Sequence, residues 1–195
     1  MLARTLSRRL REGDPLQARV ALTKADFARA SLTGLKVLAG GTPTAPTDAA
    51  LVTEAVVRAR SSFAAGMRIL APERRRAMYA LYGFCRAVDD IADAPAPIAE
   101  KRAALDGWRV ALDRIAAGQA DHALAREMAW ATERFSLPRD EFDLILEGMA
   151  IDAAPSVRIA DRTALAAYAR RVAGAVGVLS CRIFGGPDDA TRDCA

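Results

Sequence analysis

The chain has 195 residues, 52% of them hydrophobic, which is enough for one domain with a substantial core. Residues 1–45 hold eight Lys or Arg and three Asp or Glu, whereas residues 46–195 hold 20 and 21, so the formal net charge of +4 comes from the leading segment. The rest of the chain is nearly neutral, and we expect no nucleic-acid partner.

The cysteine and histidine content excludes several kinds of site. Cys85, Cys181 and Cys194 lack the spacing of metal ligands, and Cys85 and Cys181 lie in apolar helical patterns that predict burial. Reduced thiols fit a cytoplasmic protein. The single histidine, His122, makes a histidine-based triad or zinc site improbable. No run of 18 apolar residues is present, so we expect no membrane-spanning helix.

Residues 1–46 carry the least information. We predict a basic, poorly ordered or wrongly started extension before a domain at 47–195, because Gly40, Gly41, Pro43 and Pro46 break the chain. The alternative is a membrane-surface helix within this extension. The basic start lacks the apolar region of a secretory signal.

From residue 47 onward the apolar residues recur with helical spacing and show no strand alternation, which predicts an all-α domain. The expected helices run from Thr47–Asp48 to about Leu70, Pro72–Ala94, Ile98–Ala117, Ala120–Phe135, Asp140–Ala153, and from a cap at Asp161 to Phe184.

The most informative pattern lies in the helix expected over Pro72–Ala94. Met78, Tyr82, Cys85, Asp89 and Asp93 recur at steps of four, three, four and four, which places them on one face. Two acids one turn apart repel each other, and the helix dipole disfavours them near a C-terminus. This stripe of residues along one helix face therefore predicts a bound cation near its acidic end. Mg²⁺ suits the position, since it takes one or two carboxylates and completes its shell with water and phosphates.

Two further residues bear on this pattern. Arg86 lies one turn before Asp89, where it could meet a diphosphate. The alternative is that Asp89, Asp90 and Asp93 form a solvated helix end. Arg74, Arg75 and Arg76, at the start of the same helix, are expected on a solvated face, and the alternative is that they are phosphate ligands.

Four segments together resemble the squalene/phytoene synthase family. The first is Y-x-x-C-R-x-x-D-D-x-x-D at Tyr82–Asp93, preceded by Ser61-Ser62-Phe63. The others are Glu147-Gly148-Met149 with Asp152, and Y-A-R-R-V-A-G-A-V-G at Tyr168–Gly177. The resemblance covers roughly residues 52–186 and implies the all-α isoprenoid-synthase (terpenoid synthase) bundle around a deep apolar cavity.

The resemblance also implies a chemistry and a set of site residues. Family members join two prenyl diphosphates head to head. Mg²⁺, for which Mn²⁺ could substitute, would be held by Asp89 and Asp93, with Asp90 as a further candidate. NADPH would be needed only if reduction to squalene follows. The catalytic candidates are Tyr82 and Arg86; the substrate-lining candidates are Ser62, Phe63, Tyr168, Val172, Val176 and Gly177.

Two structural expectations follow. Asp89 and Asp93 should turn inward beside a hollow lined by Phe63, Tyr82 and Val176. The glycine-rich stretch at 173–177 should give either tight helix packing or room for a prenyl chain.

Within the family the segment at 172–186 looks most like bacterial presqualene diphosphate synthases of hopanoid pathways, which use farnesyl diphosphate. The alternatives are a phytoene synthase acting on geranylgeranyl diphosphate, and a non-catalytic helical binding or assembly protein. The family's second acid-rich helix is not found before Ala195. We therefore expect an incomplete synthase that is weakly active or inactive alone. Separately, we expect a cytoplasmic protein in peripheral contact with the inner face of the membrane, because its substrate and product would be lipids.

Overall fold

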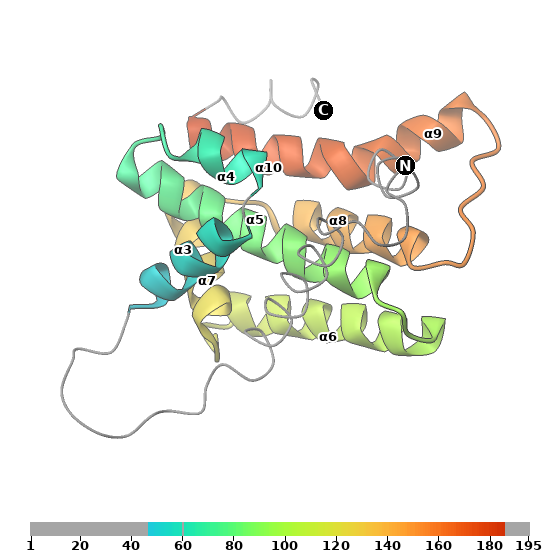
Figure 1. Ribbon diagram of the computed structural model, residues 1–195, viewed down its shortest axis with the longest axis horizontal. Helices are drawn as coiled ribbons and strands as arrows, with labels where there is room; N and C mark the ends of the chain where they lie inside the picture. Colours follow the sequence, from blue (N-terminus) through green and yellow to red (C-terminus); the bar gives the residue numbers. More distant parts are fainter. Residues whose placement is uncertain (1–46, 60, 186–195) are drawn as a thin grey trace, which may run out of the picture. The chain divides into compact units, whose positions relative to one another are not determined.

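The computed structural model of the protein describes residues 47–59 and 61–185, and every regular element within these ranges is helical. The described residues belong to one compact unit (Figure 1). The elements are α3 (Asp48–Arg58), α4 (Ser62–Met67), α5 (Pro72–Asp93), α6 (Ile98–Ala116), α7 (Ala123–Phe135), α8 (Arg139–Asp152), α9 (Arg162–Ala169), η1 (Arg170–Gly174) and α10 (Ala175–Phe184). The extension predicted at residues 1–46 lies outside the described ranges.

Helix α5 lies at the centre of the bundle, with α6, α7 and α8 against it (Figure 1). Pro72 occupies its first turn, where no backbone donor is needed, and the helix ends just before Pro95, as the sequence predicted. Phe84 is fully buried and makes edge-to-face contacts with Trp108 and Phe142, at 5.4 and 5.3 Å between ring centroids. These three rings form the middle of the core.

The stretch before α5 is two helices rather than the one expected. Thr47 caps α3 and Ser61 caps α4, each by accepting a hydrogen bond from the backbone N–H three residues later, at 3.2 and 3.1 Å. Ser61 is thus an N-cap and interrupts the helix that the apolar spacing predicted, because a serine side chain satisfies the free donors of a new helix start. A small second core lies beneath these two helices and consists of Val52, Val56, Ala64, Met67 and Tyr79.

Helices α6 and α8 follow the predicted ranges closely, whereas α7 starts three residues late. His122 caps α7 through its Nδ1, which accepts from the Ala125 N–H at 3.2 Å. Arg76 of α5 forms a two-pronged pair with the buried Glu127 of α7, at 2.6 and 2.9 Å, and stacks on the Trp130 ring. The prediction that Arg76 lies on a solvated face is therefore wrong. The buried carboxylate of Glu127 holds the Arg76 side chain against α7, and the sequence pattern gave no sign of this pairing.

The last three elements continue one another from the predicted cap at Asp161, which accepts from the Ala164 N–H at 2.7 Å. The π-helical turn η1 within this run was not predicted. The run at 162–184 is long and apolar enough, by length and composition, to cross a membrane, and only 17% of its apolar window is buried. The sequence criterion of 18 unbroken apolar residues missed it. Core helices of soluble proteins meet the same criteria, so the finding assigns no membrane topology.

Candidate active site

The acid motif lies on the last turns of α5, beside the core face and not on it. The buried residues of α5 recur one position earlier than the predicted stripe: Ala77, Leu81, Phe84, Val88 and Ala92, all at most 4% exposed. The Asp89 side chain is 42% exposed, and Asp93 is exposed. The inward orientation predicted for Asp93 is therefore wrong, because the stripe is rotated by one residue, about 100° of helix, from the core.

Arg86 is held by two of the motif's acids. Its guanidinium lies 2.7 Å from Asp90 and 3.3 Å from Asp89. The Asp90 side chain is only 10% exposed, whereas those of Arg86 and Asp89 are 26% and 42% exposed. Asp90 therefore acts as an anchor for Arg86, which leaves Asp89 and Asp93 as the more accessible carboxylates.

Lys101 at the start of α6 stabilises the end of α5. Its Nζ donates to the Ala92 carbonyl at 2.8 Å, at the C-terminus where the helix dipole is negative. This cation offsets part of the unfavourable field around Asp89 and Asp93. The sequence analysis did not predict this role for Lys101. Lys101 stands out in the sequence only as the one lysine of the described residues.

The donors at the end of α5 fit a partly hydrated divalent cation. Within the described ranges there is no group of three His, Cys, Asp or Glu side chains that could enclose a metal. Asp89 and Asp93 alone supply two carboxylates one turn apart, which matches Mg²⁺ bound by one or two carboxylates together with water and substrate phosphates. The donor set suits such a shared site and does not suit a closed structural site.

Cys85 lies between Tyr82 and Asp89 on the same side of α5, in surroundings that disfavour its thiolate form. Burial raises the pKa of its thiol to about 12, and the neighbouring Asp89 carboxylate adds to the shift. The half-buried position agrees with the predicted small hydrophobe. Cys181, predicted to be buried, is exposed instead.

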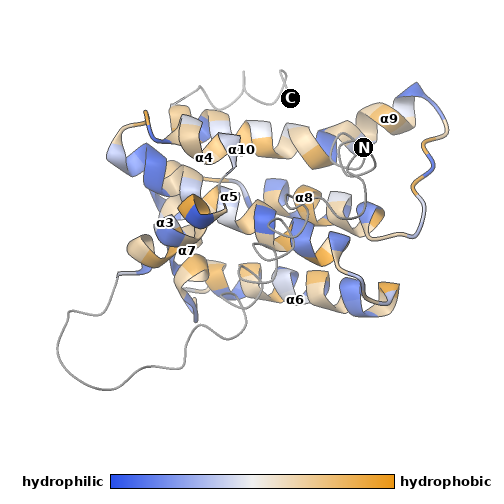
Figure 2. Cartoon of the chain, in the orientation of Figure 1, coloured by the Kyte–Doolittle hydropathy of each residue, from blue (hydrophilic) through white to orange (hydrophobic). Residues whose placement is uncertain are grey.

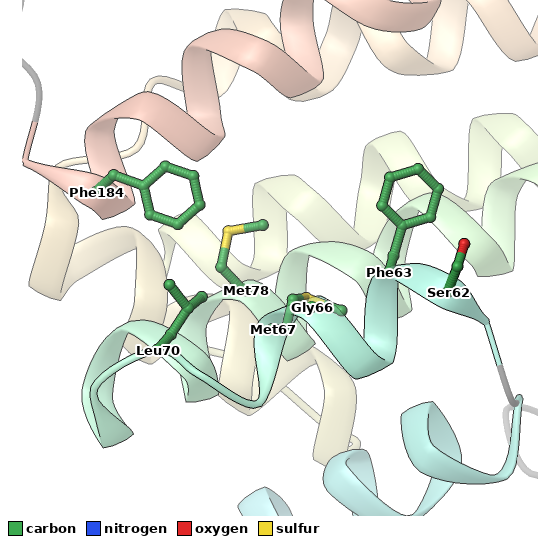
Figure 3. A pocket seen from close by; sticks show the side chains of 7 residues that line it. All are labelled: Ser62, Phe63, Gly66, Met67, Leu70, Met78 and Phe184. Carbon is green, nitrogen blue, oxygen red and sulfur yellow. The ribbon is translucent and has the colours of Figure 1, made fainter.

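A hollow of about 490 Å³ lies between α4, α5 and α10 (Figure 3). It is lined by Ser62, Phe63, Gly66, Met67, Leu70, Met78 and Phe184. The predicted lining residues Ser62 and Phe63 border it, whereas Tyr82 and Val176 do not. Tyr82 instead packs against the second core, and Val176 packs against the main core.

The remaining predicted lining residues lie on the run from α9 to α10. The Tyr168 hydroxyl donates to Asp152 at 2.7 Å, which gives a partner to an acid whose role the sequence left open. Val172 packs against the core and meets Gly148. A Cβ built on Gly177 would have no heavy atom within 4 Å, so this glycine faces open space. The close helix contact is made by Gly148 and not by Gly177.

A family model described as squalene/phytoene synthase matches residues 56–195. The chain belongs to the squalene/phytoene synthase family. It is 42% identical over 128 residues to the presqualene diphosphate synthases of Rhodopseudomonas palustris and Zymomonas mobilis, covering 46% and 43% of those proteins. It is 33% identical over 124 residues to phytoene synthase 1 of Solanum lycopersicum, covering 30% of that protein. The chain thus spans less than half the length of these curated relatives.

A solved structure agrees with the family assignment. The crystal structure of squalene synthase HpnC from Alicyclobacillus acidocaldarius matches with a TM-score of 0.64 and 29% sequence identity, over 73% of this chain and 53% of that one. The predicted all-α synthase fold is thereby confirmed. The higher identity to the presqualene diphosphate synthases than to the phytoene synthase agrees with the more specific resemblance drawn from the sequence.

Proposed function

We propose that the chain is a Mg²⁺-dependent head-to-head prenyltransferase that condenses two molecules of farnesyl diphosphate to presqualene diphosphate in squalene or hopanoid biosynthesis. The observation that carries the proposal is the α5 face on which Tyr82, Arg86, Asp89 and Asp93 follow one another at steps of four, three and four. The identity of 42% to presqualene diphosphate synthases supports this reaction over others of the family.

The diphosphate of the first substrate would bind at the C-terminal end of α5. Asp89 and Asp93 would hold Mg²⁺, which neutralises a departing diphosphate as a Lewis acid when it is bound. Arg86 would share the negative charge of the diphosphate, and Asp90 fixes the guanidinium for that contact. Tyr82, one turn before Arg86, would orient the diphosphate or relay the proton lost in the condensation, by passing its own hydroxyl proton on as it accepts the new one.

The prenyl chain would run along α5 toward the hollow. Asp89 and Met78 are eleven residues apart, which is about 16 Å along a helix at 1.5 Å per residue. This length is comparable with an extended farnesyl chain. The hollow beside Met78 is apolar apart from Ser62, as a prenyl tail requires. Apolar walls would also keep water away from a carbocation.

The α9–α10 run would supply the rest of the substrate lining. Gly177 borders open space, where a substrate chain could pass, and the ring of Tyr168 would be held in place by the hydrogen bond from its hydroxyl to Asp152. Val172 and Val176 would contribute only the parts of their side chains that the core leaves uncovered.

Product analysis tests the proposal. We expect the chain incubated with farnesyl diphosphate and Mg²⁺ to form presqualene diphosphate slowly or not at all, because it spans less than half the length of the presqualene diphosphate synthases that it matches. Any product should be presqualene diphosphate. Efficient turnover would contradict the expected weak activity. A preference for geranylgeranyl diphosphate would favour phytoene synthase, and failure to bind either substrate would favour a non-catalytic module.

We place the protein in the cytoplasm, in peripheral contact with the membrane.

A further inference from the structure

We propose that the α4–α5 turn and the end of α10 form a docking surface for an anionic lipid bilayer. This surface, called here the α4–α10 corner, consists of the apolar residues Phe63, Ile69, Leu70 and Phe184 and the basic residues Arg68, Arg74 and Arg75. The proposal does not depend on the reaction assigned above, although Phe63, Leu70 and Phe184 also line the hollow that is given there to the prenyl tail.

The apolar part of the corner is unusually exposed. Ile69 is 89% exposed and Phe63 74%, the two highest values among the large hydrophobic residues of the described ranges, and Phe184 is 44% exposed. Leu70, Phe63 and Phe184 border one hollow, so they lie together (Figure 3). Ile69 precedes Leu70 on the turn and does not line the hollow. Its exposed surface therefore lies outside the hollow that the substrate would use.

Three arginines surround these apolar residues. Arg75 Nη1 donates to the Arg68 carbonyl at 3.2 Å, and Arg74 Nη2 lies 3.3 Å from the position that a Cβ on Gly185 would occupy, next to Phe184. The apolar turn and the hydrophilic start of α5 adjoin each other in Figure 2. Basic groups beside exposed hydrophobic side chains are the pattern of proteins that insert at the surface of anionic membranes.

The charges of the corner are not neutralised by nearby acids. Glu73 pairs with Arg134, and Arg76 pairs with Glu127. Arg68, Arg74 and Arg75 form no ion pair with an acid anywhere in residues 47–59 and 61–185. Arg74 and Arg75 also lie in the first turns of α5, where the helix dipole disfavours cations. An anionic partner would offset this cost.

A bilayer fits these observations better than a second copy of the chain does. A copy of the same corner would bring arginines against arginines, and like charges across an interface are unfavourable. Anionic headgroups complement the arginines, and Ile69 and Phe184 can enter the boundary between headgroups and acyl chains.

Vesicle flotation of the full chain tests the proposal, with vesicles of phosphatidylcholine alone and of phosphatidylcholine mixed with phosphatidylglycerol. We expect binding to the anionic vesicles that weakens as salt is raised. Ile69→Ser should lower the partition coefficient by about tenfold or more. Arg68→Gln and Arg74→Gln should each lower it about fivefold. The basic leading segment is present in every variant, so the comparison reports the corner alone.

Matched controls come from α6, which lies across the bundle from α10 (Figure 1). Val110 is 59% exposed and Arg102 is exposed, and Val110→Ser and Arg102→Gln should bind vesicles as the wild type does. Equal binding by the corner variants and the wild type would overturn the proposal, as would equal binding to neutral and anionic vesicles. Light scattering tests whether the corner instead joins two copies of the chain. If the wild type is a dimer, and Ile69→Ser dissociates the dimer but leaves vesicle binding unchanged, the proposal is wrong.

Discussion

The guanidinium of Arg86 lies 2.7 Å from the carboxylate of Asp90, whose side chain is only 10% exposed. Of the adjacent acids of the motif, the more buried one therefore makes the shorter contact with Arg86, while Asp89 keeps 42% of its side chain exposed. Neighbouring aspartates with the same sequence signature thus have different tasks. Asp90 is the closer and more buried partner of Arg86, whereas Asp89, which also contacts Arg86 at 3.3 Å, is the more exposed of the two.

Asp90→Asn should destabilise the fold by about 1–2 kcal/mol, because Arg86 loses the charge that holds it and a partly buried cation is left with weaker partners. Asp106→Asn is the control, since Asp106 also pairs with an arginine of its own helix but has a side chain that is 68% exposed. It should cost less than about 0.5 kcal/mol. Urea unfolding measures both variants. If Asp90→Asn and Asp106→Asn lower the free energy of unfolding by the same amount, Asp90 does not anchor Arg86.

Gly148→Ala should destabilise the contact between α8 and η1. A Cβ at Gly148 would lie 2.8 Å from Val172 Cγ1 and 3.3 Å from Arg171 Cβ, so one helix must shift, at a cost of about 1–3 kcal/mol. Adding Val172→Ala should recover part of the loss. Gly107→Ala is the matched control, since nothing lies within 4 Å there and alanine should stabilise α6 by about 0.5–1 kcal/mol. Destabilisation of equal size at both glycines would contradict the packing account.

The two ion pairs between α8 and η1 should differ in strength. Glu141 is 1% exposed and receives two hydrogen bonds from Arg170, at 2.7 and 2.8 Å, whereas Glu147, which pairs with Arg171, has a side chain that is 47% exposed. Glu141→Gln should cost about 3 kcal/mol in the free energy of unfolding, since it leaves a charge poorly paired. Glu147→Gln should cost less than about 1 kcal/mol. The reverse order in thermal or urea unfolding would refute this ranking.

His122 should make the stability depend on pH. Burial lowers the pKa of His122 below its ordinary value, Arg126 and Arg114 act in the same direction, and Asp121 opposes them. Protonation would also remove the Nδ1 acceptor that caps α7. Because the unfolded chain binds the proton more readily, the free energy of unfolding should fall as pH drops below about 6.5.

His122→Asn provides the comparison for that effect, because asparagine can cap the helix and does not titrate. Its free energy of unfolding should change less between pH 7 and 5.5 than that of the wild type. His122 is the only histidine of the chain, so no other histidine contributes in this range. Parallel pH profiles for the two proteins would show that His122 is not responsible.

The sequence predicted most helices well because their boundaries carry local chemical signals. Pro72 begins α5, Pro95 follows its end, and Asp161 caps α9, and each of these acts through neighbouring backbone groups. Ser61 shows the limit of such reasoning. The same residue suits a helix interior by apolar spacing and a helix start by hydrogen bonding, and the structure uses the second.

The features that the sequence could not predict depend on pairs distant in the chain. Arg76 and Glu127 are 51 residues apart, so nothing local shows that this arginine turns inward. Helical spacing placed Asp89 and Asp93 on one face but could not fix that face to within one residue of the core. The site residues therefore stay predictions, supported by the family and by their arrangement along α5.

Isothermal calorimetry of farnesyl diphosphate binding tests the central claim most directly, with Mg²⁺ or with EDTA, for the wild type and for Asp89→Asn and Asp93→Asn. Asp143→Asn on α8 is the control, since its partly exposed carboxylate pairs with Arg139 and is not part of the acid motif of α5. The account predicts Mg²⁺-dependent binding by the wild type and the control, weakened at least about tenfold in both α5 variants. Binding of equal strength in all four proteins, or binding unaffected by EDTA, would contradict it.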